Sequence, residues 1–406
     1  MKNKIVEMIG INKTFPNVKA VEDGKFDLYA GEIHSLIGEN GAGKSTMMKM
    51  LYGVYTPDSG EVIINGRSMQ KLTSKEAIGL GIGMVHQEFM LVKELTVLEN
   101  IILGFEPVKG RLNTIDFDKA KKKINTYIEK YGLKVDLNKK VADIPVGEAQ
   151  RVEIIKTLYR GANILIMDEP TAVLTPQETV QLLKILDSLR ASGKSIIFIS
   201  HKLNEVMEIS DRITVMRHGH HVCTTDKASV TIPDLAKMMV GREVFLNVKK
   251  QPKNEKGKDE TLLEIKDIYV PGDREHSKLR GLSLNIKKGE ILGIAGVDGN
   301  GQNELVEAIS GLRKVEKGEI IFKGKCIQGY SPLKIRQAGI SHIPADRNKT
   351  GLNKQFTIRD NLVSNCFYKK PYSSGIKLNM NKLDQYAEEL IKKYDIRPTD
   401  KDIRVG

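Results

Sequence analysis

The sequence lacks the long apolar runs that a membrane protein needs. None of its 406 residues belongs to an uninterrupted apolar stretch near the roughly 18 residues that cross a bilayer. The N-terminal segment, MKNKIVEMIGINKTF, has the pattern of a strand and no long apolar core of a signal peptide. We therefore expect a cytoplasmic chain, with any membrane pathway supplied by other chains.

Cysteine is also scarce. The three cysteines, Cys223, Cys326 and Cys366, are far apart and form no metal-ligand spacing. An odd number of widely separated cysteines is typical of reduced thiols in a cytosol. We interpret them as small apolar residues.

Acidic residues are outnumbered, and the formal net charge is +13. Such a charge fits nucleic acid, anionic lipid or simply a solvated basic surface. The two lysine clusters, Lys119–Lys123 and the polar segment 251–260, lack the interleaved aromatic residues that single-strand binders use. We expect no nucleic acid as a partner and a basic face near the membrane surface.

A glycine-rich loop is the most informative motif that the chain does contain. Residues 38–45 read GENGAGKS and fit the phosphate-loop pattern G-x-x-x-x-G-K-[ST]. An apolar run, 33–37, precedes the loop, and a helix is expected to begin near Lys44. The backbone N–H groups and the helix N-terminus would face phosphate, Lys44 would neutralise the β- and γ-phosphates, and Ser45 would ligate Mg²⁺. A chance glycine turn is a poor explanation for an eight-residue match between strand and helix.

Two further strands end in residues that suit phosphate chemistry. The apolar run 164–167 predicts a strand buried on both faces, followed by Asp168 and Glu169. Asp168 would hold Mg²⁺ through water, and Glu169 would act as a general base, a role worth about 10²–10⁴-fold in rate. The run 195–200 leads into His201, at an edge where α/β sheets bind ligands, so we interpret His201 as a γ-phosphate sensor.

Taken together, these stretches resemble the ATP-binding subunits of ABC transporters. The order matches: phosphate loop, Q-loop (Gln87), signature region, Walker B (Asp168, Glu169), D-loop near 172–174, and H-loop (His201). The resemblance implies α/β P-loop NTPase domains with a helical subdomain, and ATP with Mg²⁺ as cofactors. The catalytic residues would be Lys44, Gln87, Glu169 and His201, and the metal ligands Ser45, Gln87 and Asp168. The nucleotide-binding residues would be Phe15, stacked on adenine, and Gly38, Glu39, Asn40, Gly41, Ala42, Gly43, Lys44, Ser45 and Thr46.

The chain contains an internal repeat much longer than that of a solenoid. Gly31 recurs at Gly289, an offset of 258, and Tyr131 recurs at Tyr394, an offset of 263. This pattern predicts a first ABC domain at 1–246, a polar linker at 247–260 and a second domain at 261–406. Adding 263 to Pro145 gives 408, so we expect the second copy to be incomplete.

The second phosphate loop is degenerate. Residues 296–303 read GVDGNGQN, with Gln302 and Asn303 where the pattern has lysine and serine. The signature of the first domain is also unusual, because residues 145–150 read PVGEAQ where the family has a sequence near LSGGQ. Glu148 would place negative charge near a phosphate. In the family each ATP lies between one loop and the other signature, so we expect these two defects to share one site and the isolated chain to be weakly active.

Residues 88–145 contain two helical patterns, one of them over 117–131. In the family this segment is the helical subdomain that docks on membrane subunits. Gln87 would then connect the γ-phosphate with that docking surface.

The resemblance extends to the importers of simple sugars and nucleosides, and three stretches (81–92, 157–178 and 293–305) resemble the purine-nucleoside branch most. It implies an ATPase at the cytoplasmic face of the cell membrane, with two permease subunits and a lipid-anchored binding protein as partners. A monosaccharide importer of the ribose or galactose type remains an alternative. A soluble tandem ATPase acting on ribosomes or DNA ranks low, because of Gln302 and the short linker. A fragment that only binds nucleotide is a third alternative.

Overall fold

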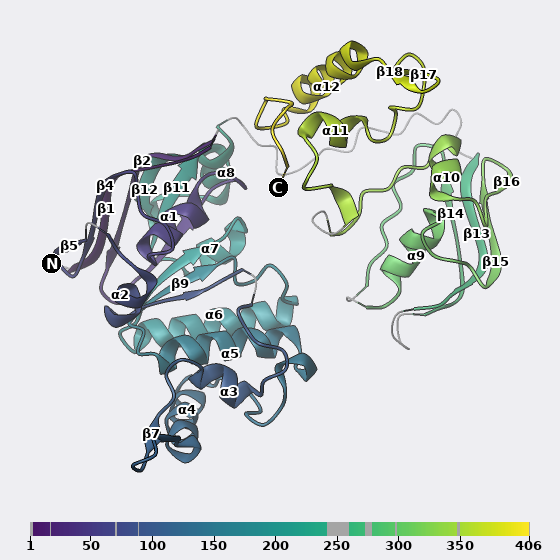
Figure 1. Ribbon diagram of the computed structural model, residues 1–406. Coiled ribbons are helices and arrows are strands. Elements are labelled where there is room, and N and C mark those ends of the chain that lie inside the picture. The colour runs from purple at the N-terminus through teal and green to yellow at the C-terminus, as the bar shows by residue number, and fades with distance from the viewer. Residues whose placement is uncertain are drawn as a thin grey trace. The chain divides into compact units, whose positions relative to one another are not determined.

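The computed structural model describes residues 3–16, 18–69, 71–87, 89–241, 260–272, 278–296, 299–346 and 350–405 (Figure 1). The chain divides into two compact units, 1–248 and 249–406. The expected linker, 247–260, lies outside the described residues except for Glu260. Within the described ranges, no helix combines the length and apolar character needed to cross a bilayer.

An antiparallel sheet opens the first unit. It consists of β1 (Lys4–Phe15), β2 (Val18–Tyr29), β4 (Ser59–Ile64) and β5 (Arg67–Met69), in the order β2-β1-β4-β5. Alternate residues of β1, such as Val6 and Met8, are buried, as expected of a sheet with one covered face. These side chains share a core with α1 (Lys44–Leu51), whose Met47 and Leu51 are fully buried.

A six-stranded, mainly parallel sheet carries the phosphate-binding motifs. Its strands are β3 (Ile33–Ile37), β6 (Ile82–Val85), β9 (Ile164–Asp168), β10 (Ser195–Ile199), β11 (Arg212–Arg217) and the antiparallel β12 (His220–Asp226). Their order is β12-β11-β3-β10-β9-β6. Every residue of β3, β9 and β10 is buried, as expected of strands covered on both faces, and the three predicted strands are confirmed. The carboxyl ends of β3, β6, β9 and β10 share one edge, where the motif residues follow.

Helices complete the first unit. They are α2 (Ser74–Gly79), α3 (Val97–Ile102), α4 (Phe117–Tyr131), η1 (Val141–Asp143), α5 (Val146–Tyr159), α6 (Pro176–Ala191), α7 (Leu203–Ile209), η2 (Lys227–Ser229) and α8 (Ile232–Val240). The helix predicted over 117–131 is α4, which Asp116 caps and Gly132 ends in the left-handed region, with φ 65°. Together with α3 and a short hairpin, β7 (Val108–Lys109) and β8 (Thr114–Ile115), it packs beyond α5, far from the antiparallel sheet (Figure 1).

The second unit also begins with a four-stranded antiparallel sheet. Its sheet, β14-β13-β15-β16, consists of β13 (Thr261–Val270), β14 (Leu279–Lys287), β15 (Lys317–Phe322) and β16 (Lys325–Cys326). The helices α9 (Gln302–Ile309), α10 (Pro332–Ala338), α11 (Ile358–Val363) and α12 (Met380–Tyr394) follow, with a hairpin of β17 (Ser373–Ser374) and β18 (Lys377–Leu378) before α12.

One repeated detail shows that the duplication is structural. The Asn100 amide donates to Val92 O and Thr96 O, both at 3.0 Å, and its oxygen accepts from Val92 N at 2.8 Å. Asn361 makes the same three bonds with Asn353 and Thr357, at 2.8–3.0 Å. The two copies therefore fix the segment before α3 and the segment before α11 in the same way.

The units differ where the first has its parallel sheet. The stretch 291–295 is equivalent to β3 by the offset of 258, yet it forms no strand, and Ile291 is 97% exposed. In the first unit β3 lies between β10 and β11. A strand of this composition needs such neighbours, because its backbone N–H and C=O groups are otherwise unpaired.

Candidate functional site

The loop between β3 and α1 wraps around a lysine. Gly43 precedes the helix with φ 92°, and a Cβ there would lie 2.4 Å from Ala20 O, so only glycine fits. Lys44 is 5% exposed, and its Nζ donates to the carbonyls of Gly38 and Glu39, each at 2.9 Å. Burial lowers the pKa of Lys44, against the opposing effect of Glu169, Asp168 and Glu39. The loop backbone thus holds the Lys44 ammonium group through the carbonyls of Gly38 and Glu39.

Helix α1 and strand β9 meet through a short polar contact. Ser45 Oγ donates to Asp168 Oδ1 at 3.0 Å. Asp168 is 4% exposed, and burial raises its pKa, while the Ser45 hydrogen bond acts in the opposite direction. The pair presents a hydroxyl and a carboxylate, two hard oxygen donors, beside the lysine.

Glu169 connects the two remaining predicted residues. Its Oε2 accepts from Gln87 Nε2 at 3.3 Å, and its Oε1 lies 3.2 Å from His201 Nδ1. The backbone of Glu169 adopts φ 48°, a left-handed conformation that costs a non-glycine residue about 1–2 kcal/mol. Its N–H donates to Ile199 O at 3.0 Å, which holds this conformation. The structure therefore brings together side chains from the ends of β6, β9 and β10.

The other predicted nucleotide contacts surround the same loop. Glu39, Asn40 and Gly41 are exposed at its tip, Ala42 is buried, and Thr46 follows Ser45 in α1. Phe15, at the end of β1, is half-buried and packs edge-on against Tyr55, with ring centroids 5.2 Å apart. The stacking role of Phe15 on adenine stays a prediction.

The second loop differs in what covers its first glycine. A Cβ at Gly296 would lie 1.9 Å from Gln302 Nε2, so the amide side chain lies over the backbone at the start of the loop. Gly301 keeps the conformation of Gly43, with φ 99°. Val297 and Asp298 lie outside the described residues. This loop thus has a neutral amide where the first has a cation.

The signature segment shows where Glu148 points. Pro145 caps α5, and Glu148 Oε1 accepts from Asp136 N at 2.9 Å, which directs the carboxylate toward the segment that precedes α5. Gly147 is buried against α6, and a Cβ there would meet Glu178 Oε1 at 2.1 Å. Sequence reasoning treated Glu148 as a charge at the helix N-terminus and did not anticipate the contact with Asp136.

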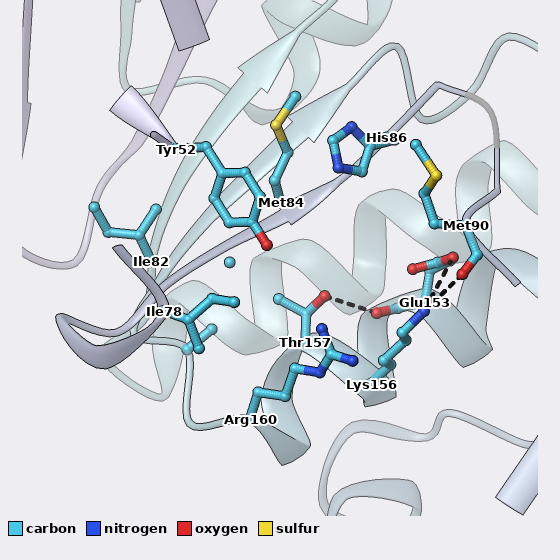
Figure 2. A pocket seen from close by; sticks show the side chains of 12 residues that line it. Tyr52, Ile78, Ile82, Met84, His86, Met90, Glu153, Lys156, Thr157 and Arg160 are labelled. Carbon is cyan, nitrogen blue, oxygen red and sulfur yellow. Dashed lines mark hydrogen bonds and ion pairs between the residues drawn. The ribbon is translucent and has the colours of Figure 1, made fainter. Parts of the chain in front are cut away.

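A cavity of about 110 Å³ lies beside the Q-loop, between β6, α5 and the end of α1 (Figure 2). Glu153 and Lys156 line it, and Lys156 Nζ donates to Met90 O at 2.7 Å. Glu153 is 3% exposed; burial raises its pKa and lowers that of Lys156. Glu153 Oε1 lies 3.9 Å from Lys156 Nζ and has no hydrogen-bond partner in the part of the chain that the structure describes.

Sequence reasoning missed this cavity. The only available signal was a pair of charged residues, Glu153 and Lys156, on either side of two isoleucines in α5. Burying a carboxylate oxygen that accepts no hydrogen bond costs folding free energy, unless another group donates a hydrogen bond to it. His86 lines the cavity and precedes Gln87, whose side chain donates to Glu169. The cavity is therefore connected through the Q-loop with the site around Glu169.

Comparison with known proteins identifies the family. The family model described as ABC transporter matches residues 21–172 and 279–405. The chain belongs to the ABC transporter family. It is a nucleotide-binding ATPase chain with two segments of that family, and its first unit has the P-loop NTPase fold.

Individual relatives cover nearly the whole chain. The guanosine import ATP-binding protein NupO of Bacillus subtilis is 48% identical over 98% of this chain and 77% of its own length. The nucleoside import ATP-binding protein NupA of Lactococcus lactis subsp. cremoris is 46% identical over 97% of this chain and 77% of its own length. Relatives named for import of D-allose or ribose match at 40% identity and below.

The crystal structure of an ABC transporter cassette in its ADP conformation aligns with 59% of this chain and all of its own, with a TM-score of 0.53 and 24% identity. At that identity the likeness shows the fold alone. It supports the assignment of the ABC cassette fold to part of this chain.

Proposed function

We propose that this chain is the ATP-hydrolysing subunit of a nucleoside importer, acting at the cytoplasmic face of the cell membrane. One observation carries the proposal: Lys44, Ser45, Asp168, Glu169, Gln87 and His201 converge at one sheet edge. The names of the relatives at 46–48% identity support nucleosides over sugars as cargo. The units 1–248 and 249–406 support two domains, close to the expected 1–246 and 261–406.

The residues present fit a bound Mg²⁺. Ser45 Oγ and Asp168 Oδ1 are oxygen donors 3.0 Å apart, and Mg²⁺ is usually held by one or two protein oxygens together with substrate phosphates. When bound, the ion would neutralise charge that develops on the phosphates. Gln87 would reach the same ion through its side-chain oxygen after it leaves Glu169.

The remaining residues would act on the γ-phosphate and the attacking water. Lys44 would exchange its two carbonyl partners for phosphate oxygens, because a charge-assisted bond to phosphate is stronger than one to a carbonyl. Glu169 would accept a proton from the water, and His201 would orient that water beside the γ-phosphate. Gln302, which cannot supply a positive charge, would leave the second loop a structural site.

The cavity beside Gln87 would receive part of a permease subunit. Its orphan acceptor, Glu153 Oε1, suits a donor group of the partner, and Met90 at its edge is 60% exposed. Filling the cavity would move the segment that carries Gln87. Two permease subunits and a lipid-anchored binding protein would complete the importer.

Reconstitution into vesicles tests the proposal. The chain, reconstituted with two permease subunits and a binding protein from the same organism, should take up labelled guanosine with ATP consumption. An excess of unlabelled guanosine should compete, whereas ribose or galactose should not. Competition by the sugars alone would reject nucleosides as cargo and favour the monosaccharide alternative.

A further inference from the structure

The hairpin between β7 and β8 exposes apolar residues at a projecting end of the first unit. All residues from 108 to 115 are exposed, and Leu112, in the turn, is 89% exposed. Six large apolar residues of this region are exposed by 39–89%: Leu103, Phe105, Val108, Leu112, Ile115 and Phe117. A soluble surface rarely gathers so many in one short segment, so the cluster indicates a contact with another phase or molecule.

Basic residues flank this apolar tip. The segment 103–123 has six lysines and arginines against three acids. Glu106 accepts from Gly104 N, and Asp116 accepts from Lys119 N and lies 3.7 Å from Lys109 Nζ. The basic side chains at 109, 111, 119, 122 and 123 belong to exposed residues. The hairpin thus has exposed aliphatic side chains at its tip and basic side chains beside them.

A cavity of about 310 Å³ lies at the base of the same hairpin. Phe105 and Pro107 line one part of it, and the cations of Lys119, Lys123 and Arg160 line another, with no carboxylate among the lining residues. Lys123 Nζ donates to Tyr159 O at 2.8 Å, and Arg160 Nη2 donates to Leu103 O at 2.9 Å, so both are held in place with donors to spare. Two positioned cations and the nearby Lys119, beside the rings of Phe105 and Tyr159, suit a phosphate group attached to apolar chains.

The second unit carries the same combination in a different sequence. Ile376 lies in the turn between β17 and β18 and is fully exposed. Leu378 and Met380 are exposed by 49% and 46%. The segment 367–382 contains four lysines and no acid. Two hairpins in equivalent places therefore share an aliphatic tip and positive flanks, although their residues differ.

We propose that the β7–β8 and β17–β18 hairpins bind anionic phospholipid at the membrane surface, with Leu112 and Ile376 inserted among the acyl chains. Each lysine or arginine near an anionic surface adds about fivefold to membrane affinity, and each inserted aliphatic side chain about tenfold or more. The inference rests on the proposed location at a membrane, but not on the cargo or on ATP hydrolysis.

The absence of tryptophan from the sequence allows a site-specific test. Leu112→Trp and Ile376→Trp each introduce one fluorophore into the 406-residue chain. Val180→Trp on α6 and Leu312→Trp after α9 are matched controls, because these residues are 46% and 60% exposed outside both hairpins. The probe is a vesicle of phosphatidylcholine and phosphatidylglycerol in equal parts, with pure phosphatidylcholine as the neutral reference.

The tryptophans at 112 and 376 should shift to shorter wavelength with the anionic vesicles, and the controls should not. Leu112→Glu and Ile376→Glu should each weaken co-sedimentation by about tenfold or more, and salt near 1 M should reverse binding. Equal shifts at the control positions, or equal binding to neutral vesicles, would overturn the proposal. A shift that appears only with permease subunits in detergent would assign the hairpins to a protein contact instead. None of these measurements needs nucleotide or cargo. A negative result would therefore reject lipid binding by the hairpins and leave the importer proposal unaffected.

Discussion

Ser45 and Asp168, 123 residues apart in the sequence, share a hydrogen bond of 3.0 Å between Oγ and Oδ1. This contact joins the phosphate loop, which follows β3, to the end of the Walker B strand β9, on the other side of β10. It places a hydroxyl and a carboxylate where one Mg²⁺ would need them.

Lys44→Ala should weaken ATP binding by about 10–100-fold, because it removes a positioned cation worth about 1.5–3 kcal/mol in charge-assisted bonds. Gln302→Ala, at the equivalent position of the second loop, should change the affinity less than about threefold. Calorimetric titration of both variants measures the difference. Equal losses would show that the two loops are not functionally distinct.

Glu169→Gln should lower ATP turnover of the assembled transporter by about 10²–10⁴-fold while leaving ATP affinity unchanged or higher. The amide keeps the size of the side chain and its contacts with Gln87 and His201, but it accepts no proton. Single-turnover hydrolysis and nucleotide retention on a filter measure both effects. Turnover near the wild-type rate would remove Glu169 from the role of base.

Asp168→Asn should stabilise the nucleotide-free chain and weaken Mg²⁺-dependent ATP binding. Burial raises the pKa of Asp168 in the folded state, so its contribution to stability is full below the unfolded pKa and is lost as pH rises through the folded pKa. At neutral pH the ionised carboxylate therefore destabilises the fold. The melting temperature should rise, by about 2–4 °C per kcal/mol for a unit of this size.

Asp118→Asn is the matched control, because Asp118 is an exposed acid on α4. Its effect on unfolding should stay within about 0.5 kcal/mol. The gain from Asp168→Asn should diminish toward acidic pH, where the wild-type carboxyl is protonated as well. A melting temperature that falls at neutral pH would contradict the assignment of a burial penalty to Asp168.

Gly147→Ala should destabilise the first unit by about 1 kcal/mol, because the added Cβ would displace Glu178 from the capping box of α6. In a Glu178→Ala background the same substitution should cost less, since the obstructing carboxylate is gone. Chemical denaturation of the four proteins in this cycle gives the coupling energy. Strict additivity would show that Gly147 does not act through Glu178.

Much of the nucleotide site could be predicted from the sequence, because its motifs are local. The stretch IHSLI followed by GENGAGKS predicts a strand, a turn and a helix, and β3 and α1 lie where this pattern places them. The helix over 117–131 was predicted with its true bounds, because its cap, apolar spacing and terminal glycine all lie within one segment.

The tertiary structure decided what lies between distant segments. That Gln87 and His201 both meet Glu169 depends on the order β3-β10-β9-β6, and no local pattern encodes that order. The direction of Glu148 and the burial of the Glu153–Lys156 ion pair depend on how α5 packs. The sequence by itself determined the chemistry of each motif, since propensity and residue type act over a few positions. Which motifs meet, and which apolar residues stay exposed as Leu112 and Ile376 do, is decided only by packing over long distances along the chain.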